Sequence, residues 1–98
     1  MTNNEVFRAF ANGLSAKGGS VRSEVTESGA AVLYSYATPI ALKPGDGFPT
    51  YFDARKYSVT TSKQVNQAKR EASYVRDMTH GEFRILCRQY GANLAGAR

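Results

Sequence analysis

Hydrophobic positions in the first 14 residues recur at the spacing of an amphipathic helix. The residues that share one face are Phe7, Phe10, Ala11 and Leu14. Thr2 and Glu5 stand at the spacing of a capping box, which marks a helix N-terminus. The pattern predicts a helix over 2–14 that needs a sheet or another helix to cover its phenylalanines. The segment 15–20, with two adjacent glycines, predicts a flexible connection.

The hydrophobic period changes to two after residue 20. Residues 21–26 alternate as a half-exposed strand does, and residues 30–36 form a nearly continuous apolar and aromatic run, which is typical of a central strand. Further apolar segments up to residue 54 are separated by turns that contain proline and glycine. We therefore expect an antiparallel meander of three to four strands over 20–57.

Helical spacing returns after this meander. One apolar stripe consists of Val65, Ala68, Ala72 and Val75. Thr61 and Gln64 stand before it at capping-box spacing, so we expect a helix over 62–77. A run of hydroxyl residues, 60–62, supplies side chains that can satisfy the free N–H groups of the first turn.

A second capping box, Thr79 and Glu82, opens another helix, which Gly91 ends. The apolar face of this helix consists of Phe83, Leu86, Cys87 and Tyr90. The two helices are expected to form a helical pair over 62–90, packed on one face of the sheet. Residues 92–98 are expected to be a frayed tail.

These elements predict one α+β domain over residues 1–98, with an N-terminal helix and a C-terminal pair of helices on a small antiparallel sheet. A chain of 98 residues buries enough surface for one core without staples. Its single cysteine excludes an internal disulfide. Because no secretory signal stands at the N-terminus and no window approaches the roughly 18 apolar residues of a membrane span, we expect a cytoplasmic protein.

The positive charge lies in the C-terminal half of the chain. The formal net charge is +5, of which residues 1–53 carry −1 and residues 54–98 carry +6. On a helical wheel, basic and polar residues occupy the arc opposite the apolar stripe of the 62–77 helix. This basic arc consists of Lys63, Asn66, Lys69, Arg70, Ser73 and Arg76.

A basic arc of this kind suits a phosphate backbone, because each neutralised phosphate releases a counterion. The candidate phosphate contacts are Arg55, Lys56, Lys63, Lys69, Arg70 and Arg76. Tyr51 and Tyr57 could offer stacking surfaces to unpaired bases. The alternatives are a solvated helix face, an acidic protein partner, and a smaller anion site at the 60–62 run with Lys56 and Lys63.

A helix-turn-helix unit is a further alternative for the two C-terminal helices. The first helix is longer than such a unit normally has, and the basic arc lies on the first helix rather than the second. We therefore favour a helical pair that packs on the sheet.

Catalytic and metal-binding patterns are weak. His80 is the only histidine and stands beside a helix cap, and Cys87 lies almost two helical turns away, too far for a hydrogen bond between the two. Cys87 is therefore interpreted as a core residue. One Cys, one His and scattered carboxylates do not make a metal site, and we expect no metal and no cofactor.

Two stretches, Leu33 to Ala41 and Lys56 to Lys63, carry the pattern YSYxTPIA…KYSxTTSK. This pattern resembles a small domain of uncharacterised function that occurs in bacteriophage and bacterial proteins, over roughly residues 30–66. The resemblance implies a short basic protein of a phage or a mobile element, and it implies no activity.

We expect a binding protein rather than an enzyme. The first hypothesis is that the basic C-terminal half contacts nucleic acid or a nucleoprotein complex. The alternative is a phage-encoded inhibitor of a host enzyme or defence system, such as an anti-CRISPR, that acts through protein contacts, which could include an acidic host protein. The sequence does not define the target or the oligomeric state.

Overall fold

The computed structural model describes residues 1–94, which form an α+β fold. In chain order the elements are α1 (Asn3–Ala11), β1 (Ala16–Lys17), β2 (Val21–Val25), β3 (Ala31–Ser35), β4 (Thr38–Lys43), β5 (Thr50–Asp53), α2 (Val59–Glu71), β6 (Val75–Met78) and α3 (His80–Gln89). The six strands of the described residues form one sheet in the order β1-β2-β3-β4-β5-β6. The predicted α+β class and N-terminal helix are confirmed, and the prediction of three to four strands is too low.

Strand β3 lies within the sheet and is covered on both faces. All five of its residues are buried. Ala31 and Leu33 belong to one apolar cluster, whereas Val32 and Tyr34 belong to the other. A strand buried on both faces has a continuous apolar sequence, which is why the run over 30–36 predicts a central strand correctly.

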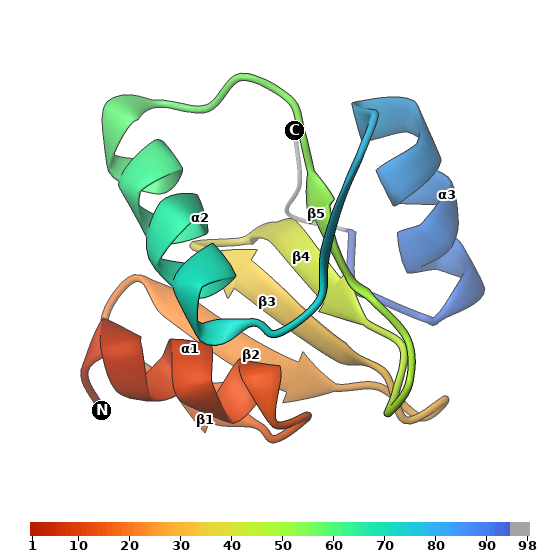
Figure 1. Ribbon diagram of the computed structural model, residues 1–98, viewed down its shortest axis with the longest axis horizontal. Coiled ribbons are helices and arrows are strands. Elements are labelled where there is room, and N and C mark those ends of the chain that lie inside the picture. The colour runs from red at the N-terminus through yellow and green to blue at the C-terminus, as the bar shows by residue number, and fades with distance from the viewer. Residues whose placement is uncertain (95–98) are drawn as a thin grey trace.

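Helices cover both faces of the sheet. Helices α1 and α2 lie side by side over one face, and α3 lies over the other (Figure 1). Phe7 and Phe10 of α1 and Val65 of α2 pack in the first apolar cluster, and Phe83 and Cys87 of α3 pack in the second. The prediction that the two C-terminal helices pair on one face is therefore wrong.

The segment 15–20, predicted as a flexible connection, contains the edge strand β1, which pairs antiparallel with β2. The Gly18 N–H donates to the carbonyl of Val21 at 2.9 Å. A Cβ at Gly18 would lie 3.0 Å from the Asn3 Oδ1 and 3.1 Å from the Val6 Cγ2. Glycine therefore allows this edge to lie against α1, and the segment is ordered.

Helix α2 ends at Glu71, and the chain then forms β6 instead of more helix. Strand β6 pairs in parallel with β5, from Thr50 opposite Val75 to Asp53 opposite Met78. The predicted helix over 62–77 and the predicted helical pair over 62–90 are therefore wrong. The sheet is mixed rather than purely antiparallel, because β5, α2 and β6 form a parallel crossover.

Local residue types explain this change. Ser73, Tyr74 and Val75 are weak helix formers, and the aromatic and β-branched residues among them favour strands. Val75 packs against the apolar cluster under α1 and α2. Val75 is therefore partly buried as a strand residue of β6, although the apolar stripe predicted that it would lie on a helix.

The start of α2 also differs from the prediction. Ser58 caps the helix, and its Oγ accepts a hydrogen bond from the Thr61 N–H at 3.3 Å. Gln64 does not complete a capping box with Thr61 but is buried. Its Oε1 accepts from the Ser35 hydroxyl, and its Nε2 donates to the Ser20 Oγ at 2.8 Å. This side chain therefore connects α2 to the end of β3 and to the turn between β1 and β2.

The other helix ends match their signals closely. Both predicted capping boxes, Thr2 with Glu5 and Thr79 with Glu82, are formed. The predicted stop at Gly91 is confirmed, because this residue follows α3 with a φ of 75°. Helix α1 ends at Ala11, so the prediction of a helix over 2–14 is three residues too long at its end.

Part of the predicted frayed tail is ordered. The Ala92 N–H donates to the Cys87 carbonyl at 2.9 Å, and the Asn93 N–H donates to the Tyr34 Oη at 2.9 Å. Ala92 and Leu94 pack against the apolar cluster under α3. Residues 92–94 are therefore held in place, and the rest of the predicted tail lies outside the described residues.

The helices are short compared with a membrane span, which needs about 20 apolar residues. Helix α2, with 13 residues, is the longest of those described. Within residues 1–94, no helix has the length and apolar character needed to cross a membrane.

We expect a core substitution on either face of the sheet to destabilise the whole fold. Phe10→Ala and Phe83→Ala each remove a fully buried ring, one from each apolar cluster, and each should lower the free energy of unfolding by about 3–5 kcal/mol. Ile85→Ala, at a site that is 55% exposed on α3, should change it by less than about 0.5 kcal/mol. Urea denaturation measures all three. A Phe83→Ala cost as small as the Ile85→Ala cost would contradict a core beneath α3.

Candidate functional site

The exposed side of α2 carries two of the predicted basic residues. Gln64, Val65 and Ala68 face the sheet and are buried. The opposite side presents what we call the α2 ridge, made of Lys63, Asn66 and Arg70, all of them exposed. Neither Lys63 nor Arg70 has a carboxylate within 4.0 Å among residues 1–94. Lys56 is likewise exposed and precedes the helix.

Two other members of the predicted basic arc point elsewhere. Lys69 Nζ lies 2.8 Å from the Asp77 Oδ1 and 5.5 Å from the centre of the Phe52 ring, so it turns toward β6 and β5. Arg76 belongs to β6. Because neighbouring strand residues point to opposite faces and Val75 packs under α2, Arg76 points to the α3 side. The single arc predicted from Lys63 to Arg76 is therefore wrong.

Tyr51 also lies on the α3 side of the sheet. Its neighbour Phe52 packs in the cluster under α1 and α2, so the alternation of β5 turns Tyr51 the other way. Tyr51 is opposite Arg76 in the parallel register. These two predicted site residues are brought together, but the sheet separates them from the α2 ridge.

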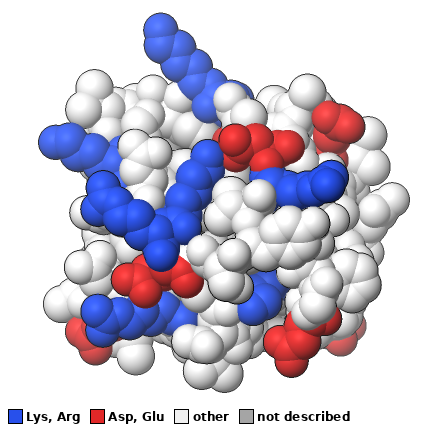
Figure 2. Space-filling model, in the orientation of Figure 1, with Lys and Arg blue, Asp and Glu red and all other residues white. Residues whose placement is uncertain are grey.

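The basic surface extends from α2 to α1. Lys and Arg side chains gather on the half of the visible face that these helices form (Figure 2). Arg8 Nε lies 3.7 Å from the Glu71 Oε1, so the acidic residue at the end of α2 faces a basic residue of α1. The pair joins the two helices and leaves the charges of Lys63 and Arg70 uncompensated among the described residues.

A second group of polar residues surrounds the buried carboxylate of Asp53, at the carboxyl end of β5. The His80 Nδ1 lies 2.6 Å from the Asp53 Oδ2, and the Arg55 N–H donates to the Asp53 Oδ1 at 3.1 Å. The Arg55 Nε is 3.9 Å from the same Oδ2. We call Asp53, Arg55 and His80 the Asp53 cluster. Its carboxylate is 1% exposed, whereas the His80 side chain is 38% exposed.

The Asp53 cluster was not predicted, although Arg55 was singled out for its charge. Asp53 and His80 are 27 positions apart, and a helix over 62–77 gives no reason to bring them together. The parallel pairing of β6 with β5 does so, because Asp53 is opposite Met78 and His80 follows two residues later. The sequence offered one hint of this contact: Asp53 lies at the end of a predicted strand and His80 at the start of a predicted helix.

Tyr57 does not offer the free stacking surface that the sequence suggested. The Arg55 guanidinium lies over its ring, 4.9 Å from the centre. The ring is partly buried and packs against the cluster under α1 and α2. Burial, and then the negative charge of Asp53, raises the pKa of Tyr57 well above its usual value. The phenol therefore remains protonated, and Arg55 occupies one of its faces.

A hollow of about 190 Å³ lies beside the Asp53 cluster, between β5, α2 and β6. Among the predicted site residues, Arg55, Tyr57 and Lys69 line it. Asp53 and Asp77 also line it. The hollow thus contains both signs of charge, and its cations lie beside carboxylates.

The predicted anion site at the hydroxyl run is used for local contacts. Ser58, rather than 60–62, supplies the capping oxygen. The Ser58 hydroxyl also donates to the Thr61 Oγ1 at 3.2 Å, and the Ser62 hydroxyl donates to the Tyr57 carbonyl at 3.5 Å. These contacts favour the interpretation of the run as a helix N-terminus.

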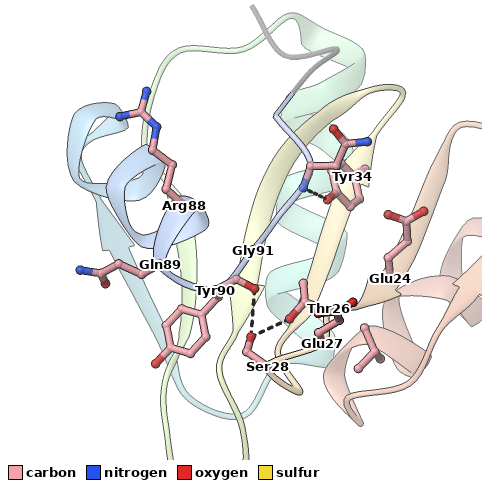
Figure 3. A pocket seen from close by; sticks show the side chains of 11 residues that line it. Glu24, Thr26, Glu27, Ser28, Tyr34, Arg88, Gln89, Tyr90 and Gly91 are labelled. Atoms are coloured by element: carbon pink, nitrogen blue, oxygen red, sulfur yellow. Dashed lines mark hydrogen bonds between the residues drawn. The ribbon is translucent and has the colours of Figure 1, made fainter.

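A broader hollow of about 710 Å³ lies between the turn after β2 and the last turn of α3 (Figure 3). The Ser28 Oγ joins its two sides by donating to the Tyr90 carbonyl at 2.9 Å. Glu24 and Glu27 line one side and Arg88 lines the other. None of the eight predicted site residues lines this hollow, and its carboxylates disfavour a phosphate.

Cys87 is a core residue, as predicted. Its side chain is fully buried in the cluster under α3. Burial, followed by the charge of Asp53, raises the pKa of its thiol to about 12. In the described part of the chain, no three His, Cys, Asp or Glu side chains converge where they could hold a metal ion.

Comparison with known proteins identifies a family. The model of a family of unknown function (DUF8033) matches residues 8–83, so the chain belongs to this family. The match includes the whole stretch over 30–66, so the expectation of a small domain of unknown function is confirmed, whereas the sequence pattern itself stays a prediction. A phage origin stays a prediction. No curated protein and no solved structure matches the chain.

The hydrogen bond between Asp53 and His80 should stabilise the fold measurably. In a double-mutant cycle with Asp53→Asn and His80→Gln, we expect a coupling of about 1–2 kcal/mol, because the carboxylate is buried. The matched cycle at Lys69 and Asp77, whose side chains are 32% and 54% exposed, should give less than about 1 kcal/mol. Equal couplings in the two cycles would contradict a special role of the buried carboxylate.

The Cys87 thiol should be inert in the folded protein. A thiol whose pKa is raised holds its proton at pH 8, and the thiolate is the reactive form. We expect an aromatic disulfide reagent to modify Cys87 at least about 100-fold more slowly in buffer than in denaturant. Rapid modification of the native protein at pH 8 would show that the thiol is not buried.

Proposed function

We propose that this member of the DUF8033 family binds nucleic acid, free or within a nucleoprotein complex, through the α2 ridge and Lys56. The observation that carries the proposal is that the exposed cations Lys63 and Arg70 share one face of α2 and have no ion pair within residues 1–94. Lys63 and Arg70 project from α2 without a carboxylate partner, whereas Arg8, Arg22 and Lys69 each have one. Unpaired cations on one helix face are the arrangement that phosphate contacts require.

The spacing of the ridge suits a backbone with repeated charges. Lys63 and Arg70 are seven residues apart, about 10.5 Å along a helix that rises 1.5 Å per residue. Phosphates of one strand recur about every 3.4 Å along a duplex axis. A helix laid along the backbone therefore meets more than one phosphate, and Asn66 between the two cations adds an amide that can donate hydrogen bonds.

We limit the proposed phosphate contacts to three residues. Lys56, Lys63 and Arg70 remain as phosphate contacts because they are exposed on or just before α2. Lys69 is occupied by Asp77, and Arg76 lies on the other side of the sheet. Three contacts of this kind give a binding constant that falls with salt by a log–log slope of about −0.7 per contact on a single strand, or about −0.9 on a duplex.

Substitution of the two cations of the α2 ridge should lower both the affinity for nucleic acid and the dependence of that affinity on salt. We expect Lys63→Ala/Arg70→Ala to lower the affinity for a labelled oligonucleotide at least about tenfold at low salt, which corresponds to about 1.4 kcal/mol. The slope should decrease in magnitude by about 1.4 on single strands, because two contacts are lost. Fluorescence anisotropy over a salt series measures both quantities.

The matched control is Lys17→Ala/Arg88→Ala, which removes the same charge from exposed sites on β1 and α3. It should leave the affinity within about twofold of the parent, because these side chains lie outside the ridge. Equal losses in the two double variants would show that only net charge matters. Failure of the parent protein to bind at low salt would overturn the proposal.

An inhibitor that contacts a host protein is the other function expected from the sequence. A pull-down from lysate with and without nuclease distinguishes the two. Under our proposal, nuclease releases the captured material, and the Lys63→Ala/Arg70→Ala variant captures less of it. A stoichiometric protein complex that survives nuclease and ignores the double variant would favour the inhibitor.

A further inference from the structure

The hydrogen bond between Asp53 and His80 favours one tautomer of the histidine ring. An ionised carboxylate can only accept hydrogen bonds, so the Nδ1 that lies 2.6 Å from the Asp53 Oδ2 carries the proton. In the neutral ring the other nitrogen, Nε2, then has a free lone pair and can accept a proton. A buried carboxylate that holds an imidazole in this tautomer is the arrangement used in general acid–base catalysis.

The His80 ring is partly exposed, and its second nitrogen lies outside the hydrogen bond with Asp53. No residue among 1–94 forms a hydrogen bond with the His80 Nε2. The side chain is 38% exposed, whereas its partner carboxylate is 1% exposed. The carboxylate of the pair is therefore shielded from solvent, whereas the imidazole is partly exposed to it.

The topology places this ring at the same end of the molecule as the start of α2. Asp53 ends β5, Met78 ends β6 beside it, and both α2 and α3 begin just after these strands. Ligands of parallel strands bind outside their carboxyl ends, where the following loops and helices meet. The Asp53 cluster therefore lies at the end of the sheet where a ligand of this topology would bind.

Positive charge is also present at this end. The Arg55 Nε and the His80 Nδ1 both lie within 4 Å of the same Asp53 oxygen. Lys56 is the next residue along the chain and is exposed. A phosphate that contacts the imidazole would therefore lie near the Arg55 guanidinium, which can stabilise additional negative charge.

We propose that the Asp53 cluster is a catalytic site that cleaves RNA, with His80 as general base and Asp53 as its positioning residue. The proposal rests on nucleic-acid binding by the α2 ridge and adds the class of substrate. RNA is favoured over DNA because its 2′-hydroxyl is a built-in nucleophile. A base and a cation next to a phosphodiester are then sufficient for chain cleavage.

The proposed cleavage of RNA needs no reactant other than the RNA itself. The His80 Nε2 takes the proton of the 2′-hydroxyl, and the 2′-oxygen attacks the adjacent phosphorus. The bond from phosphorus to the 5′-oxygen breaks, and the imidazolium returns the proton to that leaving oxygen. The products are a 2′,3′-cyclic phosphate and a 5′-hydroxyl, and the histidine is neutral again. Arg55 stabilises the charge that builds up on the phosphate oxygens.

The test uses a single-stranded RNA with a fluorophore and a quencher, and a DNA of the same sequence. Wild-type protein should cleave the RNA, and mass spectrometry should find the cyclic phosphate on the 5′ fragment. The DNA should be bound but not cleaved. Bound RNA that stays intact would overturn this inference and leave the proposed function standing. Absence of both binding and cleavage would overturn both.

Three variants separate catalysis from folding and from contaminating nuclease. His80→Asn keeps a donor near the position of Nδ1 and removes the base, so it should fold and bind RNA but cleave at least about 100-fold more slowly. His80→Ala should regain at least about tenfold of its lost rate when imidazole is added. Asp53→Asn should lower kcat about tenfold or more while KM changes less than about twofold.

Circular dichroism and RNA anisotropy check that each variant is folded and binds. Parent rates in both His80→Asn and His80→Ala would assign the cleavage to a contaminant and overturn the inference. Loss of activity in His80→Ala that imidazole does not restore, together with a full rate in His80→Asn, would assign His80 a structural role only. Arg88→Ala, prepared in parallel, should retain the parent rate.

Discussion

The parallel pairing of β6 with β5 determines where the charged side chains of the C-terminal half point. Their register, from Thr50 opposite Val75 to Asp53 opposite Met78, turns the chain between them into a crossover in which α2 lies over one face of the sheet. The same register brings the start of α3 to the end of β5. The α2 ridge and the Asp53 cluster are therefore two consequences of one topological feature, and neither would exist in a simple helical hairpin.

Burial explains why this pairing is stable. The cluster under α1 and α2 includes Phe52 of β5 and Val65 and Ala68 of α2, and Val75 of β6 packs against it. Phe83 and Cys87 of α3 fill the opposite face. Burial of this much apolar surface outweighs local helix propensity, which is weak after Glu71. The polar contact of Gln64 with the turns of the sheet then fixes the rotation of α2, and with it the direction in which Lys63 and Arg70 project.

The sequence predicted features that depend on neighbouring residues and missed those that depend on distant ones. Both capping boxes and the Gly91 stop were correct because their contacts span three to five positions. The apolar stripe through Val75 was misleading, since an apolar residue in a strand and one on a helix can satisfy the same spacing over a few positions. The basic half of the chain was recognisable from composition, but which of its cations are paired depends on the fold, which brings Lys69 to Asp77 and Arg55 to Asp53.

We propose that nucleic acid contacts the α2 side and the carboxyl end of β5 and β6. Titration of isotopically labelled protein with single-stranded RNA, followed by amide chemical shifts, tests it most directly. We expect the shifts to concentrate in residues 55–70 and around His80, and to fade as salt is raised. Shifts confined to residues 24–28 and 88–91, which line the broad hollow at the end of α3, would contradict it, as would the absence of any shift at low salt.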